Sequence, residues 1–257
     1  MIPANPVWID GLPIQRCRLL DIADTITTAA KHGDGGILAT VNLQFLALAR
    51  RDRSFRSLLL GCRYLVADGM PLIWASRIAG DPLPERLSGV DVMQALIKTA
   101  AAQNVSVYLL GGRPGAAAAS ADIWRQRHPH LRIAGVRCPP LGFDQDPVLL
   151  KAEIDAIVMA APGIVFVALG CPRQERFAVT CRDAHASAWL IGIGGSFDFV
   201  AGHTSRAPRF LQRIGLEWLH RMLHEPRRLI RRYLMECLPV GVSLLLRAAY
   251  GHRRRES

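Results

Sequence analysis

Apolar runs of strand length alternate with longer amphipathic stretches along most of the chain. The apolar runs are GILATV, YLVA, VSVYLLGG, LRIAGV, GIVFVALG and AWLIGIGG, at residues 36–41, 64–67, 105–112, 131–136, 163–170 and 188–195. Strands that are apolar throughout and separated by helices are typical of a parallel sheet covered on both faces. The pattern predicts an α/β fold with a Rossmann-like, mostly parallel sheet that has helices on both faces.

Several of the intervening helices have recognisable ends. Ser88 directly precedes the helical pattern GVDVMQALIKTAAAQ and is a good N-cap, and Gly33 directly follows IADTITTAAKH, where a helix would end. Pro114 is expected in the first turn of a helix over PGAAAASADIWRQRH.

The pattern changes after Ala201 to arginine-rich helical segments with no further strand signal. Of the formal net charge of +11, residues 201–257 contribute +8, from 12 arginines against four glutamates, and the first 200 residues contribute +3. We therefore expect an α/β domain over residues 1–203 and a basic helical C-terminal appendage over residues 204–257. The positive charge of this segment suits an anionic partner: phospholipid, nucleic acid or a phosphorylated substrate. The alternative is that these arginines form an ordinary helix face exposed to solvent.

Six cysteines are scattered through the chain without a C-x-x-C pair. This spacing argues against a disulfide framework and against a zinc site, so reduced thiols are expected. The N-terminal residues MIPANPVWIDGLPIQR lack the basic start and apolar core of a secretory signal, which favours a cytoplasmic location.

Polar side chains follow several of the predicted strands. Thr40 and Asn42 lie at the end of the first, Asp68 follows the second, Gln174 lies in the loop GCPRQE, and Arg86 lies downstream of Asp68. The carboxyl ends of parallel strands form one edge, where ligands bind. The set supplies an acid/base group, neutral donors and a cation, which suits a reaction with a phosphate leaving group. For Asp68 alone, the competing interpretation is an N-cap for a helix that begins near Met70.

Two glycine clusters, GGRPGA and GIGGSF, could hold phosphate through backbone amides. Neither is a dinucleotide-binding fingerprint, because the first lacks G-x-G and the second has Phe197 in place of the third small residue. A nicotinamide-dependent oxidoreductase is therefore disfavoured. Phosphate-binding turns at Gly111–Gly112 and at Gly194–Gly195 remain candidates, with tight strand-to-helix turns as the structural alternative.

A set of eight motifs extends over nearly the whole chain: TVN (40–42), ADGMPL (67–72), ERLSGVDV (85–92), LLGG (109–112), GCPRQE (170–175), GIGGSFDFVAG (192–202), RAP (206–208) and GLEWLHRMLHEPRRLIRRY (215–233). These motifs, in this order, resemble the WecG/TagA/CpsF family of glycosyltransferases, glycosyltransferase family 26. In one loop, Arg173 stands where the family often has lysine, which keeps the charge.

The resemblance implies an activity, partners and a location. Members of the family transfer a sugar from a UDP-sugar to an undecaprenyl-diphosphate-linked saccharide, with inversion at the anomeric carbon and without a metal or another cofactor. They act at the cytoplasmic face of the bacterial plasma membrane in the synthesis of exopolysaccharide, teichoic acid or other surface polysaccharides. The transferred sugar would be N-acetylmannosamine, its uronic acid or glucose, and a homo-oligomer is possible.

The resemblance also implies roles for individual residues. Asp68 matches the proposed catalytic base, and Thr40 is placed with it as a catalytic residue. The expected substrate-binding residues are those that match the family's other motif positions, the two glycine turns and the arginines of the appendage: Asn42, Arg86, Gly111, Gly112, Gln174, Gly194, Gly195, Arg221, Arg228 and Arg231. No predicted strand ends in a D-x-D motif, which would bind a metal ion. Backbone amides and cationic side chains would therefore hold the diphosphate of UDP.

The apolar run from Cys237 to Leu246 is ten residues long, and we expect Pro239 and Gly241 to interrupt it. A membrane-spanning helix needs about 20 apolar residues, so this run predicts an element that lies at the membrane surface, with an ordinary core helix as the alternative.

The other functional hypothesis is a non-enzymatic, basic nucleic-acid-binding protein. It explains only the basic C-terminal segment, and no recognition-helix or RNA-binding motif accompanies it.

Overall fold

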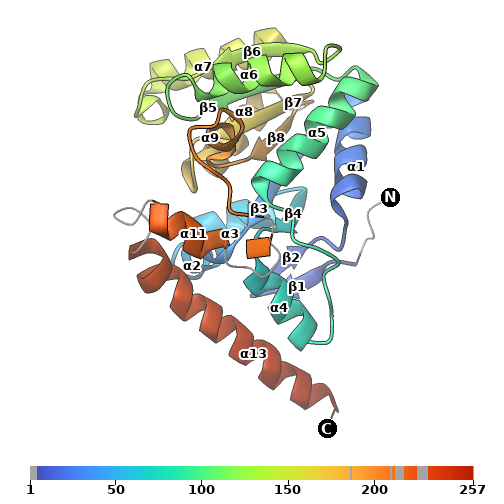
Figure 1. The fold of residues 1–257 in the computed structure, drawn as a ribbon, viewed down its shortest axis with the longest axis vertical. Coiled ribbons are helices and arrows are strands. Elements are labelled where there is room, and N and C mark those ends of the chain that lie inside the picture. The colour runs from blue at the N-terminus through green and yellow to red at the C-terminus, as the bar shows by residue number, and fades with distance from the viewer. Residues whose placement is uncertain (1–4, 186, 209, 212–216, 225–230, 257) are drawn as a thin grey trace.

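A single eight-stranded sheet forms the centre of the protein (Figure 1). The computed structural model describes residues 5–256 except 186, 209, 212–216 and 225–230. The strand order is β1-β2-β4-β3-β8-β7-β5-β6, and only β1 and β2 pair antiparallel. The strands are β1 (Val7–Ile9), β2 (Leu12–Ile14), β3 (Gly36–Val41), β4 (Tyr64–Ala67), β5 (Val107–Gly111), β6 (Ile133–Arg137), β7 (Ile164–Ala168) and β8 (Trp189–Gly192).

The six strands expected from the apolar runs are confirmed, as is the α/β class. The β1–β2 hairpin at the edge of the sheet was not expected from the sequence. Its signal is the pair Asp10–Gly11 between two short apolar triplets, and both residues have positive φ, at 52° and 74°. An Asp-Gly pair of this kind is a strong short-range indicator of a two-residue hairpin turn.

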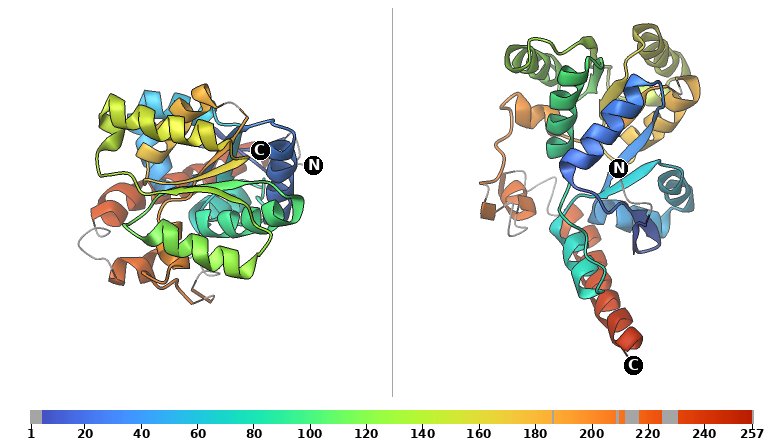
Figure 2. Two further views of the ribbon diagram at one scale, coloured as in Figure 1. Left: turned by 90° about the horizontal axis from the view of Figure 1, so that it is seen from above. Right: turned by 90° about the vertical axis from the view of Figure 1, so that its right-hand side faces the viewer.

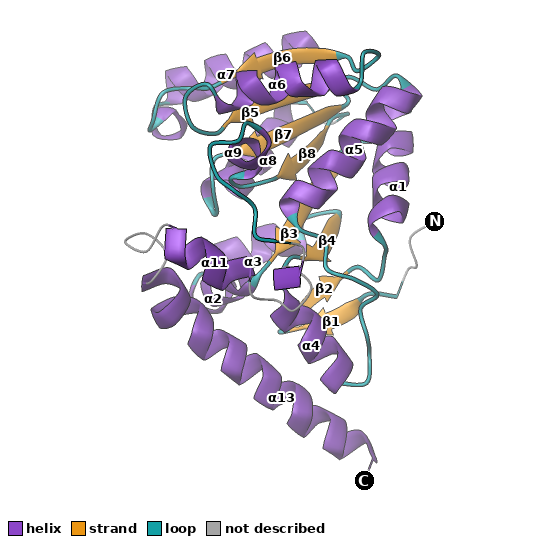
Figure 3. Cartoon of the chain, viewed as in Figure 1, coloured by secondary structure: helices purple, strands orange, loops and turns teal. Residues whose placement is uncertain are grey.

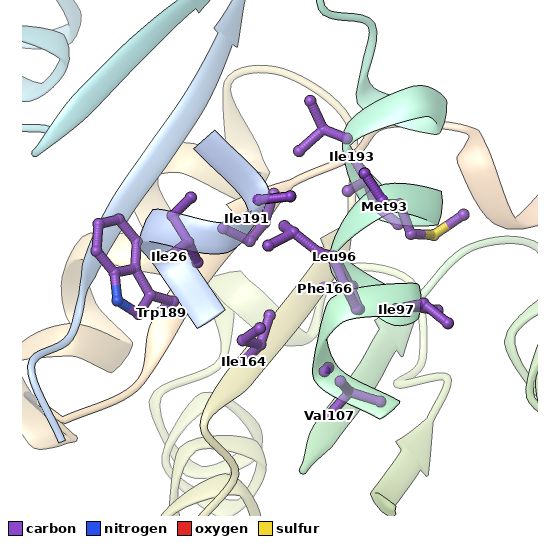
Figure 4. Packing of buried hydrophobic residues seen from close by; sticks show 14 of the residues in the cluster. Ile26, Met93, Leu96, Ile97, Val107, Ile164, Phe166, Trp189, Ile191 and Ile193 are labelled. Carbon is purple, nitrogen blue, oxygen red and sulfur yellow. The ribbon is translucent and has the colours of Figure 1, made fainter. Parts of the chain in front are cut away.

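Helices cover both faces of the sheet (Figures 2 and 3). On one face lie α1 (Leu19–Lys31), α5 (Gly89–Gln103) and α6 (Ala116–Arg127), and on the other lie α7 (Pro147–Ala160) and α8 (Arg173–Ala184). Strand residues alternate between the two cores: Phe166 and Ile191 pack with α1 and α5 (Figure 4), whereas Val165 packs with α7 and α8. Burial of both faces explains why these strands are apolar throughout.

The expected helix ends are confirmed at two of three positions. Ser88 is the N-cap of α5, where its hydroxyl accepts from the N–H of Asp91 at 3.3 Å, and Gly33 follows the C-cap of α1 with φ at +71°. The third expectation is wrong, because α6 begins at Ala116 with Gly115 as its N-cap. Pro114 therefore precedes the helix instead of lying in its first turn.

The other helices gather around the β1–β2–β4 end of the sheet or follow β8, except the short η1 (Phe143–Gln145), which connects β6 to α7 and packs on α7. They are α2 (Leu43–Arg51), α3 (Arg53–Leu60), α4 (Met70–Ile78), η1, α9 (Ser196–Val200), α11 (Glu217–His224), the π-helical η2 (Arg231–Cys237) and α13 (Leu238–Glu256). In Figures 1 and 2, α13 lies along α4 and extends away from the sheet. Val240 and Leu244 of α13 pack into the core that contains Phe45 and Leu72.

The apolar C-terminal run is a continuous helix, contrary to the expectation that Pro239 and Gly241 interrupt it. Pro239 falls in the first turn of α13, directly after the wider π-helical turns of η2, where a missing N–H is tolerated. Gly241 lies against Leu43 of α2. The 18 residues Tyr233–Tyr250 have a mean hydropathy of 1.2 and are only 17% buried, so by length and composition alone this helix could cross a membrane.

Gly111 ends β5 at a position where a side chain has no room. Its φ is +92°, and an added Cβ would lie 2.7 Å from the carbonyl oxygen of Ala168 on β7. Gly115 provides a matched control, since its φ is +82° but nothing lies within 4 Å of an added Cβ.

We expect Gly111→Ala to lower the free energy of unfolding by about 3 kcal/mol and Gly115→Ala by about 1 kcal/mol. The control substitution carries only the backbone strain, whereas Gly111→Ala also forces β5 away from β7. Urea denaturation of both variants measures the difference. Equal losses would mean that the two strands separate at no cost, which contradicts this account of Gly111.

Candidate active site

A cavity of about 470 Å³ lies at the carboxyl ends of β3, β4 and β8. It brings together seven of the residues that the sequence singled out, which are Thr40, Asn42, Asp68, Arg86, Gln174, Gly194 and Gly195. These residues come from five separate segments of the chain, and the sheet topology makes them neighbours.

The other expected site residues are placed differently. Gly111 and Gly112 are not among the residues that line the cavity, and an added Cβ on Gly112 would lie 3.2 Å from the ring of Phe197. Their positions are accounted for by packing of β5 against β7 and α9. Arg228 lies outside the described residues. Arg221 and Arg231 belong to α11 and η2, but their side chains are outside the described part of the structure.

Asp68 lies in the cavity wall directly after β4 and is half-buried. Its backbone N–H donates to the carbonyl oxygen of Val41 at 2.7 Å, which holds it beside the end of β3. The N-cap of α4 is Gly69, one residue after Asp68. The interpretation of Asp68 as the N-cap residue of this helix is therefore wrong.

Thr40 and Asn42 flank the last residue of β3. The buried Thr40 hydroxyl donates to the carbonyl oxygen of Gly192 on β8, at 3.4 Å. Asn42 is the N-cap of α2, where its side-chain oxygen accepts from the N–H groups of Gln44 and Phe45 at 3.0 and 3.3 Å. Because the helix uses the oxygen, the amide nitrogen is the part of Asn42 that can donate to a ligand.

Gln174 joins the GCPRQE loop to the turn after β8. Its side-chain oxygen accepts from the Gly194 N–H at 3.0 Å, and its nitrogen donates to Oε1 of Glu175 at 2.6 Å. Both side chains are buried, with 3% and 2% of their surface exposed. The Gly194 N–H is thus satisfied by the protein, so a diphosphate at this turn would depend on other donors.

A four-charge network ties the C-terminal segment to the start of α5. Arg86 donates to Glu217 of α11 at 2.6 Å, and Arg206 donates to both carboxylate oxygens of Asp91 at 2.7 and 2.9 Å and to the Ser88 hydroxyl at 3.2 Å. Burial raises the pKa of Asp91, but the hydrogen bonds from Arg206 and Ser88 outweigh it and keep the pKa below its ordinary value. The sequence motifs RAP and GLEW contain Arg206 and Glu217, but sequence reasoning assigned neither a role.

Asp198 of α9 adds a further carboxylate to the cavity wall. Its Oδ1 is buried without a hydrogen-bond partner among the described residues. Nδ1 of His203 lies 3.8 Å from Oδ1, and Nε of Arg113 lies 3.7 Å from Oδ2. The described lining therefore contains three carboxylates, of Asp68, Asp198 and Glu217, against the single guanidinium of Arg86. In the described part of the chain, no three His, Cys, Asp or Glu side chains form a cluster that could hold a metal ion.

The opposite side of the cavity is apolar. It consists of Met70 and Trp74 from α4, Trp218 from α11, and three leucine or valine side chains of α13, which are Leu238, Val242 and Leu245. The cavity thus has a polar floor at the strand ends and an apolar wall contributed by the C-terminal helices.

A parallel α/β sheet with a carboxylate, amides and a guanidinium in a cavity at its carboxyl edge defines an enzyme-type site for a partly polar, partly apolar ligand. Residues 7–255 match the model of the glycosyl transferase WecG/TagA/CpsF family, and the chain belongs to this family of glycosyltransferases. A relative from Bacillus subtilis (strain 168) is 32% identical over 192 residues, which are 75% of this chain and 73% of the relative. That protein is an N-acetylglucosaminyldiphosphoundecaprenol N-acetyl-beta-D-mannosaminyltransferase. The resemblance noted in the motifs is confirmed.

Burial raises the pKa of Glu175 to about 7, although hydrogen bonds from Gln174, from its own backbone and from the Cys171 thiol lower it. A carboxyl group whose pKa is higher in the folded state favours folding only while it is protonated. Ionisation of Glu175 therefore lowers the free energy of unfolding. This loss is absent below the unfolded pKa of about 4.5 and is complete above about pH 7.

We expect Glu175→Gln to remove this pH-dependent cost. Relative to the wild type, the variant should gain stability between pH 5 and pH 8, by on the order of 3 kcal/mol. Urea denaturation of both proteins at the two pH values measures the change, and a difference that stays constant with pH would contradict a raised pKa for Glu175.

Proposed function

We propose that this protein is an inverting glycosyltransferase that transfers a hexose from a UDP-sugar to an undecaprenyl-diphosphate-linked saccharide in the synthesis of a bacterial surface polysaccharide. The observation that supports it most is the cavity in which the strand-end polar residues face an apolar wall of α4, α11 and α13. The acceptor named for the Bacillus subtilis relative, a diphosphoundecaprenol that carries N-acetylglucosamine, combines the same two chemistries. N-acetylmannosamine is therefore the first donor sugar to test.

In the proposed reaction Asp68 is the general base. Its carboxylate takes the proton from the acceptor hydroxyl, the hydroxyl oxygen forms a bond to the anomeric carbon, and the bond from that carbon to UDP breaks with inversion. Thr40 lies beside the base at the end of β3, and the amide nitrogens of Asn42 and Gln174, with Arg86, are suited to contact the departing diphosphate.

The charges of the cavity support a role for the C-terminal arginines. A diphosphate would face three carboxylates and one guanidinium among the described lining residues, so further cations are needed. Arg221 follows Glu217 by four residues on α11, which places the two positions on the same side of that helix. We propose Arg221, Arg228 and Arg231 as these cations.

Purified protein, an N-acetylglucosaminyl lipid diphosphate acceptor and a panel of UDP-sugars test the proposed function directly. We expect acceptor-dependent release of UDP with one donor sugar. If no UDP-sugar gives release and the protein instead binds duplex nucleic acid in a salt-dependent manner, the nucleic-acid-binding alternative is favoured.

Asp68→Asn should lower the rate of transfer by about 10²–10⁴, which is the usual contribution of a positioned base. UDP affinity, measured by calorimetry, should stay within a few-fold of the wild type, because the amide keeps the shape of the carboxylate. Full transfer activity of this variant would rule out Asp68 as the base.

We also propose that residues 204–257 dock the enzyme on the cytoplasmic face of the plasma membrane as a peripheral protein. Large apolar side chains of η2 and α13 form an exposed stripe with helical spacing, consisting of Met235, Leu238, Val242, Leu246 and Tyr250. Such a stripe beside a basic segment suits insertion into the headgroup region of an anionic leaflet, where each nearby basic residue adds roughly 1 kcal/mol.

The double variant Leu246→Ser/Tyr250→Ser should weaken binding to anionic vesicles at least about tenfold, since each buried apolar side chain contributes roughly 1.5–3 kcal/mol. Neither residue lines the cavity, so transfer to a short-chain, detergent-soluble acceptor should not change. Val242→Ser is the matched variant, because Val242 lines the cavity and should affect transfer as well. Alkaline carbonate should release the wild-type protein from vesicles, whereas retention would show that the helix Tyr233–Tyr250 spans the bilayer.

A further inference from the structure

Glu175 is a buried carboxylate that the proposed reaction does not use. It lies at the start of α8, does not line the cavity, and packs with Gln174 beneath the end of β8. A Cβ added to Gly192 would lie 2.7 Å from Nε2 of Gln174 and 2.9 Å from Oε1 of Glu175. The amide and the carboxylate are therefore pressed against strand backbone and have little freedom to reorient.

The hydrogen bonds of Gln174 fix which way its amide points. The amide oxygen accepts from the Gly194 N–H, and one amide N–H donates to Glu175. In the reverse orientation the nitrogen would face the Gly194 N–H, donor against donor, and the oxygen would face Glu175, which is repulsive whenever the carboxyl group is ionised. The group left over is the second N–H of Gln174, which is a donor.

Packing alone does not explain a carboxylate at this position. A buried charge is costly even where hydrogen bonds reach it, and Glu175 is only 2% exposed. An apolar side chain of similar size would fill the space at lower cost. What a carboxylate adds beside the Gln174 amide is an acceptor, which the nitrogen side of that amide can satisfy and the oxygen side cannot.

We infer that Glu175 is a positioning residue that orients the Gln174 amide so that Gln174 holds the turn at Gly194 and presents an N–H donor to the cavity. The ligand atom that accepts from this N–H is an oxygen of either a phosphoryl group or a sugar. The effect on sugar transfer rests on the proposed function, whereas the effect on the Gly194 turn does not.

The first experiment measures hydrogen exchange of the Gly194 amide and transfer by four variants. In Glu175→Leu, exchange at Gly194 should accelerate at least about tenfold, and transfer should fall to the level of Gln174→Ala. The double variant Glu175→Leu/Gln174→Ala should be no worse than Gln174→Ala alone, because Glu175 acts through Gln174. Glu175→Gln keeps an acceptor oxygen and should stay within about threefold of the wild type.

Glu153→Leu is the control for the loss of a buried carboxylate away from the cavity. Glu153 is 5% exposed and pairs with Arg137 at 2.6 Å. This control should lower the melting temperature without changing Gly194 exchange or the KM for the donor. Unchanged Gly194 exchange in Glu175→Leu, or additive losses in the double variant, would overturn the inference.

The second experiment exchanges the two side chains in Gln174→Glu/Glu175→Gln. The exchanged pair can keep one N–H···O contact and an oxygen for the Gly194 N–H, so the variant should fold and keep Gly194 protected. It presents only acceptor oxygens to the cavity, and transfer should therefore fall at least about tenfold. Wild-type transfer by the exchanged pair would overturn the inference, and this variant decides the matter even if Glu175→Leu does not fold. If the wild type itself transfers no sugar, the proposed function fails, while Gly194 exchange still tests Glu175.

Discussion

β3 lies between β4 and β8 in the sheet and is hydrogen-bonded in parallel to both. This pairing brings three carboxyl ends together, so that Thr40, Asp68 and the Gly192–Gly195 turn meet although they are far apart in the sequence. Two contacts fix the arrangement locally: the Asp68 N–H donates to Val41 and the Thr40 hydroxyl donates to Gly192. Without this register there would be no common floor to the cavity, and the remaining features of the site depend on it.

The second half of the cavity depends on electrostatic contacts between the C-terminal segment and the α/β part. Glu217 pairs with Arg86, and Arg206 pairs with Asp91 in the first turn of α5. Both pairs are largely buried, so solvent screens them less than it would screen pairs on an open surface. They hold α11 over the strand ends, where Trp218 becomes part of the apolar wall. The same contact leaves Arg86 already paired with a carboxylate, which is one reason why the diphosphate of the proposed reaction would need further cations from this segment.

Sequence reasoning located six of the eight strands and much of the polar floor of the cavity, because apolar runs and strand-end polar residues are local signals. Asp68, Arg86 and Gln174 followed from where strands end and from the motifs. It missed contacts that depend on three-dimensional packing, such as that of Arg206 with Asp91, since neither residue has a local pattern that indicates a partner. Gly111 and Gly112 show the same limit, because a glycine that binds phosphate and a glycine that avoids a steric clash look identical in a sequence. For Pro239, the local rule that proline interrupts a helix did not anticipate the π-helical turns that precede it.

The side chains of α13 divide into three sets that follow from helical periodicity. Val240 and Leu244 face the core, Leu238, Val242 and Leu245 line the cavity, and Leu246 and Tyr250 are exposed away from it. One helix is therefore both a wall of the site and, in the proposed function, the surface that meets the bilayer. In that proposal, an acceptor whose lipid chain stays in the membrane would place its diphosphate near Arg86 when α13 lies at the interface. If α13 meets the bilayer as proposed, its packing on α2 and α4 would set the distance between Asp68 and the membrane, and with it the part of a lipid-linked saccharide that reaches the proposed base.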